Sequence, residues 1–489
     1  MKLNKSLTPF IFGIIGIFSF APFSIKPLIF FSYAYLIREL IYKNNSRLKK
    51  LFYWSLGHWG FGMSWLIVSV YYYGETSIYL SLLIFVLLVL LLSLAFSAPL
   101  FFISKLLIKT FERSGIANLV LISSLLMLSE ISMNYLLYGI PWLIAGATLL
   151  DTISQGVYPI LGAFGASFII YFCSSLIASS SNTKDRKLLI YCLLPFIISF
   201  PNEYSINNEK NHDLEFTIIQ PSTDPFQKYN QGYEEKIEAN IIKLVEQSSI
   251  ESQLLILPEA ELPYAYEDMR FKLFQQKLPK PTIMGAWSFI DGNLYNSIIN
   301  SEGGAQYNKV HLVPFGEFIP FEKYIRGLIS FFDMPMSSVQ GGSKNQELMY
   351  LDSNNKVGYS ALICFDIAFS ESVRKSNLSS KFIINVSNDT WFGNSIGPYQ
   401  HLYLARIRAY ENNRWLIRAA NDGFSAIINN KGTIVQYIEK GEKGVLNGSL
   451  QYIEDKSFYS QYGYLFSYIL SISALFFSII INSWKKLGY

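Results

Sequence analysis

The sequence divides into two apolar segments with a long polar segment between them, and this division limits the fold more than any single motif. Residues 1–204 are dominated by Leu, Ile, Phe, Ser and Tyr, whereas residues 205–455 carry charged residues and Asn throughout. A last apolar run lies within residues 456–489. A chain of 489 residues is too long for one ordinary soluble domain. We therefore expect a membrane domain of about seven helices, an extramembrane domain, and a C-terminal transmembrane helix with a short tail.

Eight apolar runs are candidates to cross a bilayer, for which a helix needs about 20 mostly apolar residues. They lie at about residues 7–23, 26–42, 52–72, 77–104, 117–137, 157–179, 187–203 and 460–482. The first run resembles a signal peptide, but no small-residue cleavage site follows it, so we expect a retained helix. Glu130 lies inside the fifth run and indicates either a functional carboxylate or a hydrogen bond between helices.

The short loops between these runs predict the orientation of the chain. Lys and Arg gather at five sites, namely residues 2–5, 43–50, 105–113, 184–187 and 485–486. With eight spans, all five sites fall on one side of the membrane, and the alternate loops near residues 74–76 and 137–158 contain no Lys or Arg. Positively charged loops stay in the cytoplasm. We therefore expect a multi-pass protein of the bacterial inner membrane with both termini in the cytoplasm and residues 205–455 in the periplasm.

The polar segment has the pattern of an α/β domain. Short β-branched runs bounded by Gly, Pro, Asn or Asp predict strands at residues 216–220, 254–257, 282–286, 297–300, 357–363, 382–386, 426–429 and 434–436. Several runs do not alternate, as expected for strands buried on both faces. Helical patterns at residues 233–247 and 399–414 separate them, which indicates a layered α/β domain. The net charge is only +4, and no basic patch with interleaved aromatic residues is present, so nucleic acid is excluded as a partner.

Three residues at the ends of strand-like runs suggest nucleophilic catalysis. Cys364 is the only cysteine in the polar segment and closes an apolar run, while Glu259 and Lys309 follow other runs. A thiol, a carboxylate and an ammonium group can serve as nucleophile, general base and oxyanion partner. Each residue alone also fits a structural role, Cys364 as a small core residue, for example. A Gly-x-Ser-x-Gly motif and the Cys/His spacing of a zinc site are absent from the sequence.

Residues 328–336, which include Phe331 and Phe332, form an apolar but irregular segment that precedes Gly341 and Gly342. Beside a membrane such a segment can enter lipid or cover an apolar cleft. A loop buried in the domain is the alternative.

Longer motifs around these residues resemble the nitrilase superfamily and, within it, the apolipoprotein N-acyltransferase family. They are Leu-Pro-Glu at 257–259, Tyr-Asn-Lys-Val-His-Leu-Val-Pro-Phe-Gly-Glu at 307–317, Leu-Ile-Cys-Phe-Asp-Ile-Ala-Phe at 362–369, Asn-Val-Ser-Asn-Asp-Thr-Trp-Phe-Gly-Asn at 385–394, Gly-Pro-Tyr-Gln-His at 397–401, Ala-Arg-Ile-Arg-Ala at 405–409 and Arg-Ala-Ala-Asn-Asp-Gly at 418–423. Phe-Ala-Pro-Phe at 20–23 and Gly-Ile-Pro-Trp at 139–142 extend the resemblance into the membrane half.

The resemblance implies a nitrilase-like α-β-β-α sandwich beside a multi-span helical membrane bundle. It implies a Glu-Lys-Cys triad, with Glu259 as general base, Lys309 as oxyanion stabiliser and Cys364 as nucleophile, and a second glutamate at Glu317. The implied reaction has two steps. Cys364 takes an acyl chain from a phospholipid as a thioester, and the thioester then acylates the N-terminal amino group of a diacylglyceryl apolipoprotein. No cofactor and no metal are implied, and residues 328–336 would suit a lid or a wall for the acyl chain.

Three positions depart from the family pattern. The family usually has Tyr-Glu after the nucleophile, where this chain has Phe365 and Asp366. Phe365 lacks the hydroxyl but retains a backbone N–H that can serve the oxyanion, and Asp366 is one methylene shorter. A tryptophan that is frequent in the family corresponds to Tyr229 here, and Trp391 belongs to a matched motif as a further supporting residue.

Two other classes of function fit parts of the pattern. A membrane-tethered amidase of the nitrilase type shares the triad, but a tether needs only one span. A transporter or receptor with an α/β sensory domain would need polar or broken spans, and Glu130 is the main polar residue within the runs. Both readings are less consistent with the sequence than an acyltransferase.

Overall fold

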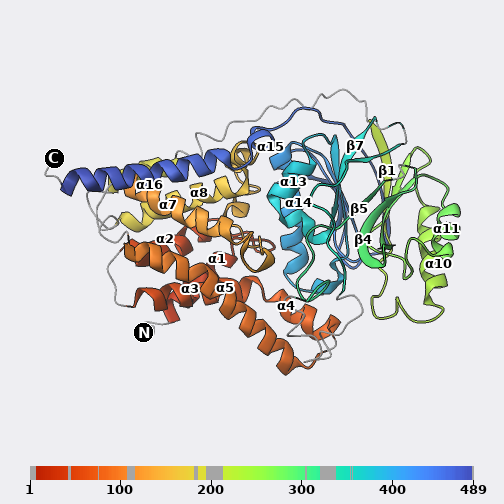
Figure 1. The fold of residues 1–489 in the computed structure, drawn as a ribbon, viewed down its shortest axis with the longest axis horizontal. Coiled ribbons are helices and arrows are strands. Elements are labelled where there is room, and N and C mark those ends of the chain that lie inside the picture. The colour runs from red at the N-terminus through yellow and green to blue at the C-terminus, as the bar shows by residue number, and fades with distance from the viewer. Residues whose placement is uncertain are drawn as a thin grey trace. The chain divides into compact units, whose positions relative to one another are not determined.

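The computed structural model describes residues 7–41, 46–74, 76–106, 116–180, 186–193, 213–302, 305–319, 338–352, 354 and 356–486 (Figure 1). The chain forms two compact units, and each is described by itself. A helical unit contains Met1–Tyr204, Ser395–Tyr403 and Tyr462–Tyr489. An α/β unit contains Ser205–Asn394 and Leu404–Gln461.

The helical unit follows the apolar runs of the sequence. Its helices are α1 (Leu7–Ile17), α2 (Leu28–Ile41), α3 (Arg47–Gly62), α4 (Trp65–Val68), α5 (Ile78–Leu106), α7 (Ile116–Ser132), α8 (Tyr158–Ser179) and α16 (Leu465–Lys486). In the described part of the run at 187–203, Arg186–Leu193 forms a 3-10 helix. By length and apolar composition, Ile78–Lys105 and Gln155–Ser179 suffice to cross a membrane, among the described residues. The full set of eight spans stays a prediction.

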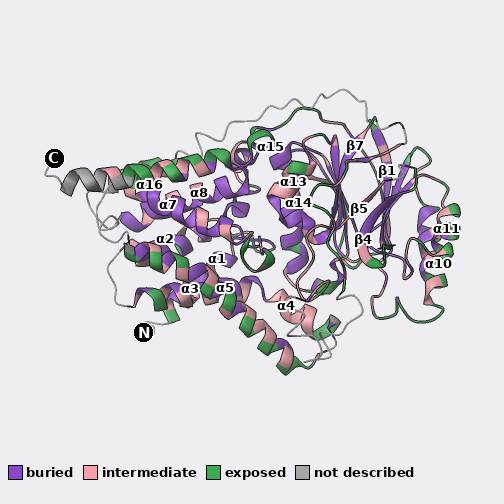
Figure 2. Ribbon diagram, in the orientation of Figure 1, coloured by how far each residue is buried: buried purple, intermediate pink, exposed green. Residues whose placement is uncertain are grey.

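Helix α5 is exposed or partly buried along much of its length, as its green and pink segments in Figure 2 show, and its sequence is almost entirely apolar. At least half of the residue surface is exposed at Leu83, Leu87, Leu94 and Phe102. In water a contiguous apolar surface of this kind is unfavourable, whereas lipid chains would cover it without loss.

Glu130 joins two helices of this unit. Its Oε1 atom accepts a hydrogen bond of 2.8 Å from the Tyr171 hydroxyl, which belongs to α8, and another of 2.6 Å from the backbone N–H of Ala145. The side chain is buried. Of the two alternatives for Glu130, the helix–helix hydrogen bond is therefore present.

The α/β unit is built from two six-stranded sheets. The first has the order β12-β1-β2-β3-β4-β5, and the second has the order β11-β10-β9-β8-β7-β6. The strands are β1 (Leu214–Gln220), β2 (Leu254–Ile256), β3 (Thr282–Ile290), β4 (Asn293–Asn300), β5 (Gln306–Asn308), β6 (Met349–Tyr350), β7 (Gly358–Ile363), β8 (Phe382–Ser387), β9 (Leu416–Ala420), β10 (Ser425–Ile428), β11 (Ile434–Ile438) and β12 (Gly444–Leu450). All eight predicted strands are confirmed, and β5, β6, β9 and β12 are additional.

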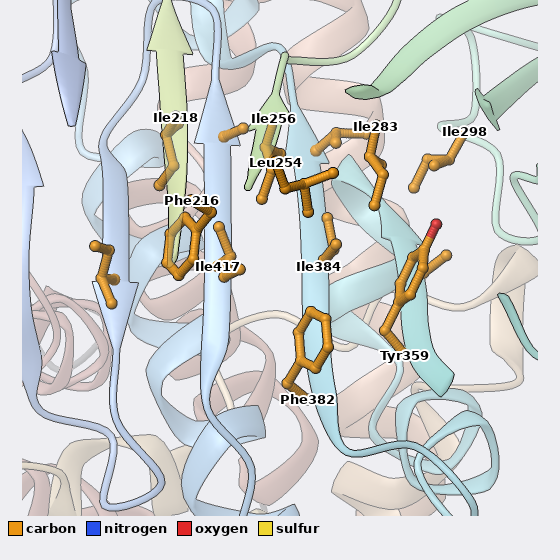
Figure 3. Close-up of a cluster of buried hydrophobic side chains, with 14 of the residues drawn as sticks. Phe216, Ile218, Leu254, Ile256, Ile283, Ile298, Tyr359, Phe382, Ile384 and Ile417 are labelled. Atoms are coloured by element: carbon orange, nitrogen blue, oxygen red, sulfur yellow. The ribbon is translucent and has the colours of Figure 1, made fainter. Parts of the chain in front are cut away.

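The inner faces of the two sheets share one apolar core, shown in Figure 3. Phe216 and Ile256 from the first sheet pack in the same cluster as Ile384 and Ile417 from the second. Because side chains alternate across a strand, the neighbouring residues on β1 and β2 point outward, where they pack against α10 (Tyr233–Val245) and α11 (Met269–Gln276). Because both faces of these strands are buried, their sequences are continuous apolar runs without alternation.

Parallel pairing determines which loops lie together. In the first sheet β1, β2 and β3 are parallel, and in the second sheet β7, β8 and β9 are parallel. The carboxyl ends of parallel neighbours lie at one edge of a sheet, which is where α/β proteins usually place their sites. The segments that follow β2, β7 and β8 contain Glu259, Cys364 and Asn388, respectively.

Candidate active site

Lys309 is a buried cation held between two carboxylates. Its Nζ atom lies 3.1 Å from Glu259 Oε1 and 2.8 Å from Glu317 Oε1, and its side chain is 1% exposed. Lys309 directly follows β5, and Glu317 lies in the loop eight residues further on. Burial of a charge is expensive unless the charge is paired and hydrogen-bonded, and these two contacts meet that requirement.

Every oxygen of the two carboxylates accepts a hydrogen bond. The Asn296 side-chain N–H group on β4 donates to Glu259 Oε1 at 2.7 Å and to Glu317 Oε1 at 3.1 Å. The backbone N–H of Asn388 donates to Glu259 Oε2 at 2.8 Å, and that of Val313 donates to Glu317 Oε2 at 2.9 Å. Both carboxylates are therefore fixed in orientation before any substrate binds.

Cys364 lies at a sharp junction between β7 and a 3-10 helix, Cys364–Ala368. Its φ angle is 46°, a left-handed conformation that is uncommon for a residue with a side chain and that recurs at functional sites. Burial raises the pKa of the Cys364 thiol, the charge of Glu259 raises it further, and Lys309 lowers it. Without substrate the sulfur is therefore a thiol rather than a thiolate.

Lys309 remains protonated in this environment. Burial by itself lowers the pKa of its ammonium group, but Glu259, Glu317 and Cys364 raise it, and the resulting pKa is well above the ordinary value. The site thus combines a fixed positive charge, a carboxylate that can accept a proton, and a neutral thiol within electrostatic range of both.

Asp366 connects the turn at Cys364 to the segment that carries Lys309. Its carboxylate accepts hydrogen bonds from the backbone N–H of His311 at 2.8 Å, the Tyr307 hydroxyl at 3.0 Å and the backbone N–H of Ile363 at 3.2 Å. Burial raises the pKa of Asp366 to about 6, although the His311 N–H and Lys309 oppose this increase. The shorter carboxylate at this position is thus bound by Tyr307 and His311, which lie two residues before and two residues after Lys309 in the sequence.

The other residues predicted to support the site have different surroundings. Phe365 packs edge-on against Phe369, with ring centroids 5.2 Å apart. Trp391 is partly exposed, and Tyr229 is half exposed while its hydroxyl accepts a 3.2 Å hydrogen bond from Trp287 Nε1. Phe331 and Phe332 lie outside the described residues, as does the rest of the segment at 328–336.

Two further residues of the site, Asn296 and Arg418, were not assigned a role from the sequence, although Arg418 begins one of the matched motifs. Asn296, which bridges both glutamates, lies within an ordinary strand pattern. Arg418 on β9 is fully buried and forms a 2.7 Å ion pair with Asp389 Oδ2, directly after Asn388 in the chain. This pair supports the loop that donates the Asn388 N–H to Glu259.

Models of known protein families match segments of both units. Residues 220–454 match the carbon-nitrogen hydrolase family model, which places the two-sheet unit in that class. Residues 12–176 match the model of the apolipoprotein N-acyltransferase N-terminal domain.

Similar proteins extend this match over nearly the whole chain. An apolipoprotein N-acyltransferase from Haemophilus influenzae is 32% identical over 96% of this chain and 94% of its own. One from Pasteurella multocida is 30% identical over 95% of this chain and 92% of its own. A solved CN-hydrolase superfamily protein from Xanthomonas campestris is 16% identical, with a TM-score of 0.38 over 49% of this chain and 91% of its own. The chain belongs to the apolipoprotein N-acyltransferase family.

Gly285 allows the turn at Glu259 to approach β3 closely. A Cβ atom at Gly285 would lie 2.5 Å from Glu259 Cα and 2.6 Å from Ala260 N, both backbone atoms that cannot rotate away. We expect Gly285→Ala to move this turn and to destabilise the protein by about 1–3 kcal/mol, measured by thermal or denaturant unfolding. In Gly444→Ala, a matched control, the new Cβ would lie 3.7 Å from Ile438 and should cost much less. Equal stability of the two variants would contradict this account of the turn.

Asp366→Glu, which restores the residue usual in the family, should impair this protein rather than improve it. Asp366 is fully buried and bonded on both oxygens, so an added methylene has no space. We expect a loss of about 1–3 kcal/mol in the free energy of unfolding, together with lower acyltransferase turnover. Asp455→Glu adds the same methylene at an exposed position and should match the wild type. Higher turnover in Asp366→Glu would show that the aspartate is a defect and not an adapted contact.

Proposed function

We propose that this protein transfers an acyl chain from a membrane phospholipid to the N-terminal amino group of a diacylglyceryl-cysteine in apolipoproteins. The observation that carries the proposal is the buried Lys309 between Glu259 and Glu317, in the unit that contains Cys364. Membership of the apolipoprotein N-acyltransferase family supports the choice of substrates. The transfer needs no cofactor, because a thioester retains the activation of the ester.

The first half-reaction forms the acyl-enzyme. Glu259 takes the proton of the Cys364 thiol as the sulfur attacks the ester carbonyl carbon of the phospholipid. The Lys309 ammonium and the backbone N–H of Phe365 stabilise the oxyanion of the tetrahedral intermediate. When the intermediate collapses, the C–O bond breaks and the leaving alkoxide takes the proton from Glu259. The products are a thioester on Cys364 and a lysophospholipid.

The second half-reaction uses the same groups to move the acyl chain from Cys364 to the amine. The amino group of the diacylglyceryl-cysteine attacks the thioester carbonyl, and Glu259 accepts the proton that the amine loses. Lys309 again stabilises the oxyanion. The C–S bond then breaks, an amide forms, and the proton on Glu259 returns to Cys364. Glu317 holds Lys309 in place throughout, since it contacts the same ammonium group.

The remaining predicted residues are assigned to substrate binding. Trp391 and Tyr229 are partly exposed aromatic side chains that can contact lipid or peptide. Phe331 and Phe332 are proposed to line the path of the acyl chain. The phospholipid donor lies in the membrane, and the exposed apolar surface of α5 supports insertion of the helical unit there as a multi-span bundle.

Cys364→Ala should abolish both acyl-enzyme formation and transfer, because no other side chain is proposed to form the thioester. Cys364→Ser should also fail, since a hydroxyl is a much poorer nucleophile without a dedicated histidine base. The assay is capture of a labelled acyl chain on the protein after incubation with labelled phospholipid, followed by transfer to a synthetic diacylglyceryl-cysteine peptide. Cys173→Ala, which removes another buried cysteine, should retain the label on the protein. A labelled acyl-enzyme in Cys364→Ala would disprove the mechanism, and release of the acyl chain mainly to water would favour a hydrolase.

Glu259→Gln and Lys309→Met should each remove turnover by a different route. Glu259→Gln retains the shape of the side chain but cannot accept a proton. Lys309→Met removes the oxyanion partner, a change that typically lowers the rate by about 10²–10³-fold. Because Lys309→Met also leaves two buried carboxylates facing each other, its folding has to be checked by thermal unfolding. A near wild-type rate in either folded variant would mean that the roles are assigned to the wrong residues.

The proposed topology places the α/β unit in the periplasm and both termini in the cytoplasm. The distribution of Lys and Arg in the loops is the basis for this orientation. We expect a reporter inserted at the exposed Asn354 to give a periplasmic signal, and a C-terminal reporter to give a cytoplasmic one. A cytoplasmic signal at Asn354 would overturn the topology and the lipoprotein substrate together.

A further inference from the structure

A buried carboxyl group and a buried ammonium group lie next to the turn at Glu259. Glu261 is 1% exposed and Lys228 is 7% exposed. The Thr223 hydroxyl donates to Glu261 Oε1, and the Lys228 ammonium donates to the carbonyl oxygen of Ala260. Ionisable groups at this depth are costly to bury, and the Lys309 ammonium bonds to Glu259 and Glu317 rather than to either of them. The reaction described above gives them no role.

The pair acts on Glu259 through the backbone. Ala260, which separates the two glutamates, has a φ angle of 42°, and this left-handed conformation is unfavourable for alanine by about 1–2 kcal/mol. The turn therefore needs bonds from outside to keep this shape. Lys228 binds the carbonyl of Ala260 itself, and Thr223 binds the side chain of the following residue. Both come from the segment that follows β1, the strand that pairs with β2.

The same segment is connected to the other side of Glu259. The Asn421 side chain accepts from the backbone N–H of Thr223 at 2.8 Å and donates to its carbonyl oxygen at 2.9 Å. The backbone N–H of Asn421 in turn donates to Ser387 O at 3.0 Å. Ser387 directly precedes Asn388, whose N–H donates to Glu259 Oε2. A closed ring of bonds thus begins and ends at Glu259 and includes loops from both sheets.

We propose that Thr223, Lys228 and Glu261 are positioning residues that hold the carboxylate of Glu259 in its orientation for proton transfer. The proposal rests on the role assigned to Glu259 above. Lys228 binds the strained turn, and the Glu261 carboxyl group, whose pKa burial raises to about 7 and the charge of Lys228 lowers, lies within electrostatic range of that ammonium. Thr223 connects this pair through Asn421 to the loop that donates to Glu259 Oε2. An error of about 1 Å in a catalytic group can lower the rate by about 10²-fold, so a ring of this kind affects turnover without touching the substrate.

The test uses the full-length protein in detergent with labelled phospholipid and a diacylglyceryl-cysteine peptide. We expect Thr223→Val and Lys228→Met to lower kcat by about 10- to 100-fold, while KM for either substrate changes by less than about 2-fold. Thr223→Ser retains the hydroxyl and should restore most of the kcat that Thr223→Val loses. If Lys228 and Glu261 act as one unit, the double variant Lys228→Met/Glu261→Gln should be no slower than the slower single variant.

Lys243→Met and Glu251→Gln make the same changes at exposed positions of the α/β unit and should have wild-type kcat. Wild-type kcat in Thr223→Val, with Glu259→Gln inactive, would overturn the positioning role and leave the proposed reaction intact. Equal losses in Thr223→Ser and Thr223→Val would also overturn it, because the hydroxyl would then not matter. Full activity of Glu259→Gln would instead overturn the proposed reaction. If Lys228→Met fails to fold, the Thr223 pair of variants still decides the outcome, since it changes only one hydroxyl and one methyl group.

Discussion

The contact on which the candidate site depends is the ammonium of Lys309 between the carboxylates of Glu259 and Glu317. A charge with 1% exposure loses nearly all its hydration, and only short contacts with opposite charges and dipoles can replace it. Two carboxylates around one ammonium leave a net negative charge, which Asn296 and the N–H groups of Val313 and Asn388 disperse. These partners come from both sheets, so the site exists only when the two sheets are packed together.

Because the site is assembled from both sheets, part of it could not be predicted from the sequence, whereas much of the fold could. Strands buried on both faces leave continuous β-branched runs, and β1, β2, β7 and β8 were all recognised from such runs. The strand β9 was missed because Arg418 interrupts its apolar pattern, although that side chain is buried and paired with Asp389. The polar sequence of β12, with Asn447 and Ser449, was similarly misleading. In the sequence, a buried charged residue whose partner lies far along the chain cannot be distinguished from a charged residue at the surface.

The candidate site shows the same division. Glu259, Lys309 and Cys364 were recognisable because each follows a strand within a long motif. Asn296 was not, since a single amide within a strand gives no indication of which carboxylates lie opposite. Asp366 was recognised as a departure from the family, but the groups that its shorter carboxylate contacts could not be read from the sequence. Its carboxylate accepts hydrogen bonds from Tyr307 and His311, which flank Lys309, and from the backbone N–H of Ile363, and these contacts could be known only from the tertiary structure.

The protonation state of Cys364 affects how well its sulfur is protected from side reactions before substrate binds. A thiolate is the form that reacts with oxidants and with stray electrophiles, and burial raises the pKa of Cys364 so that the thiol persists at rest. Glu259 contributes to this increase through its own charge, yet the same carboxylate is the proposed acceptor of the thiol proton. Proton transfer removes the charge on Glu259 as the charge on sulfur appears, so the repulsion between them does not build up. In the proposed mechanism the nucleophile is therefore generated only during attack, when the negative charge passes on to an oxyanion that Lys309 is placed to stabilise.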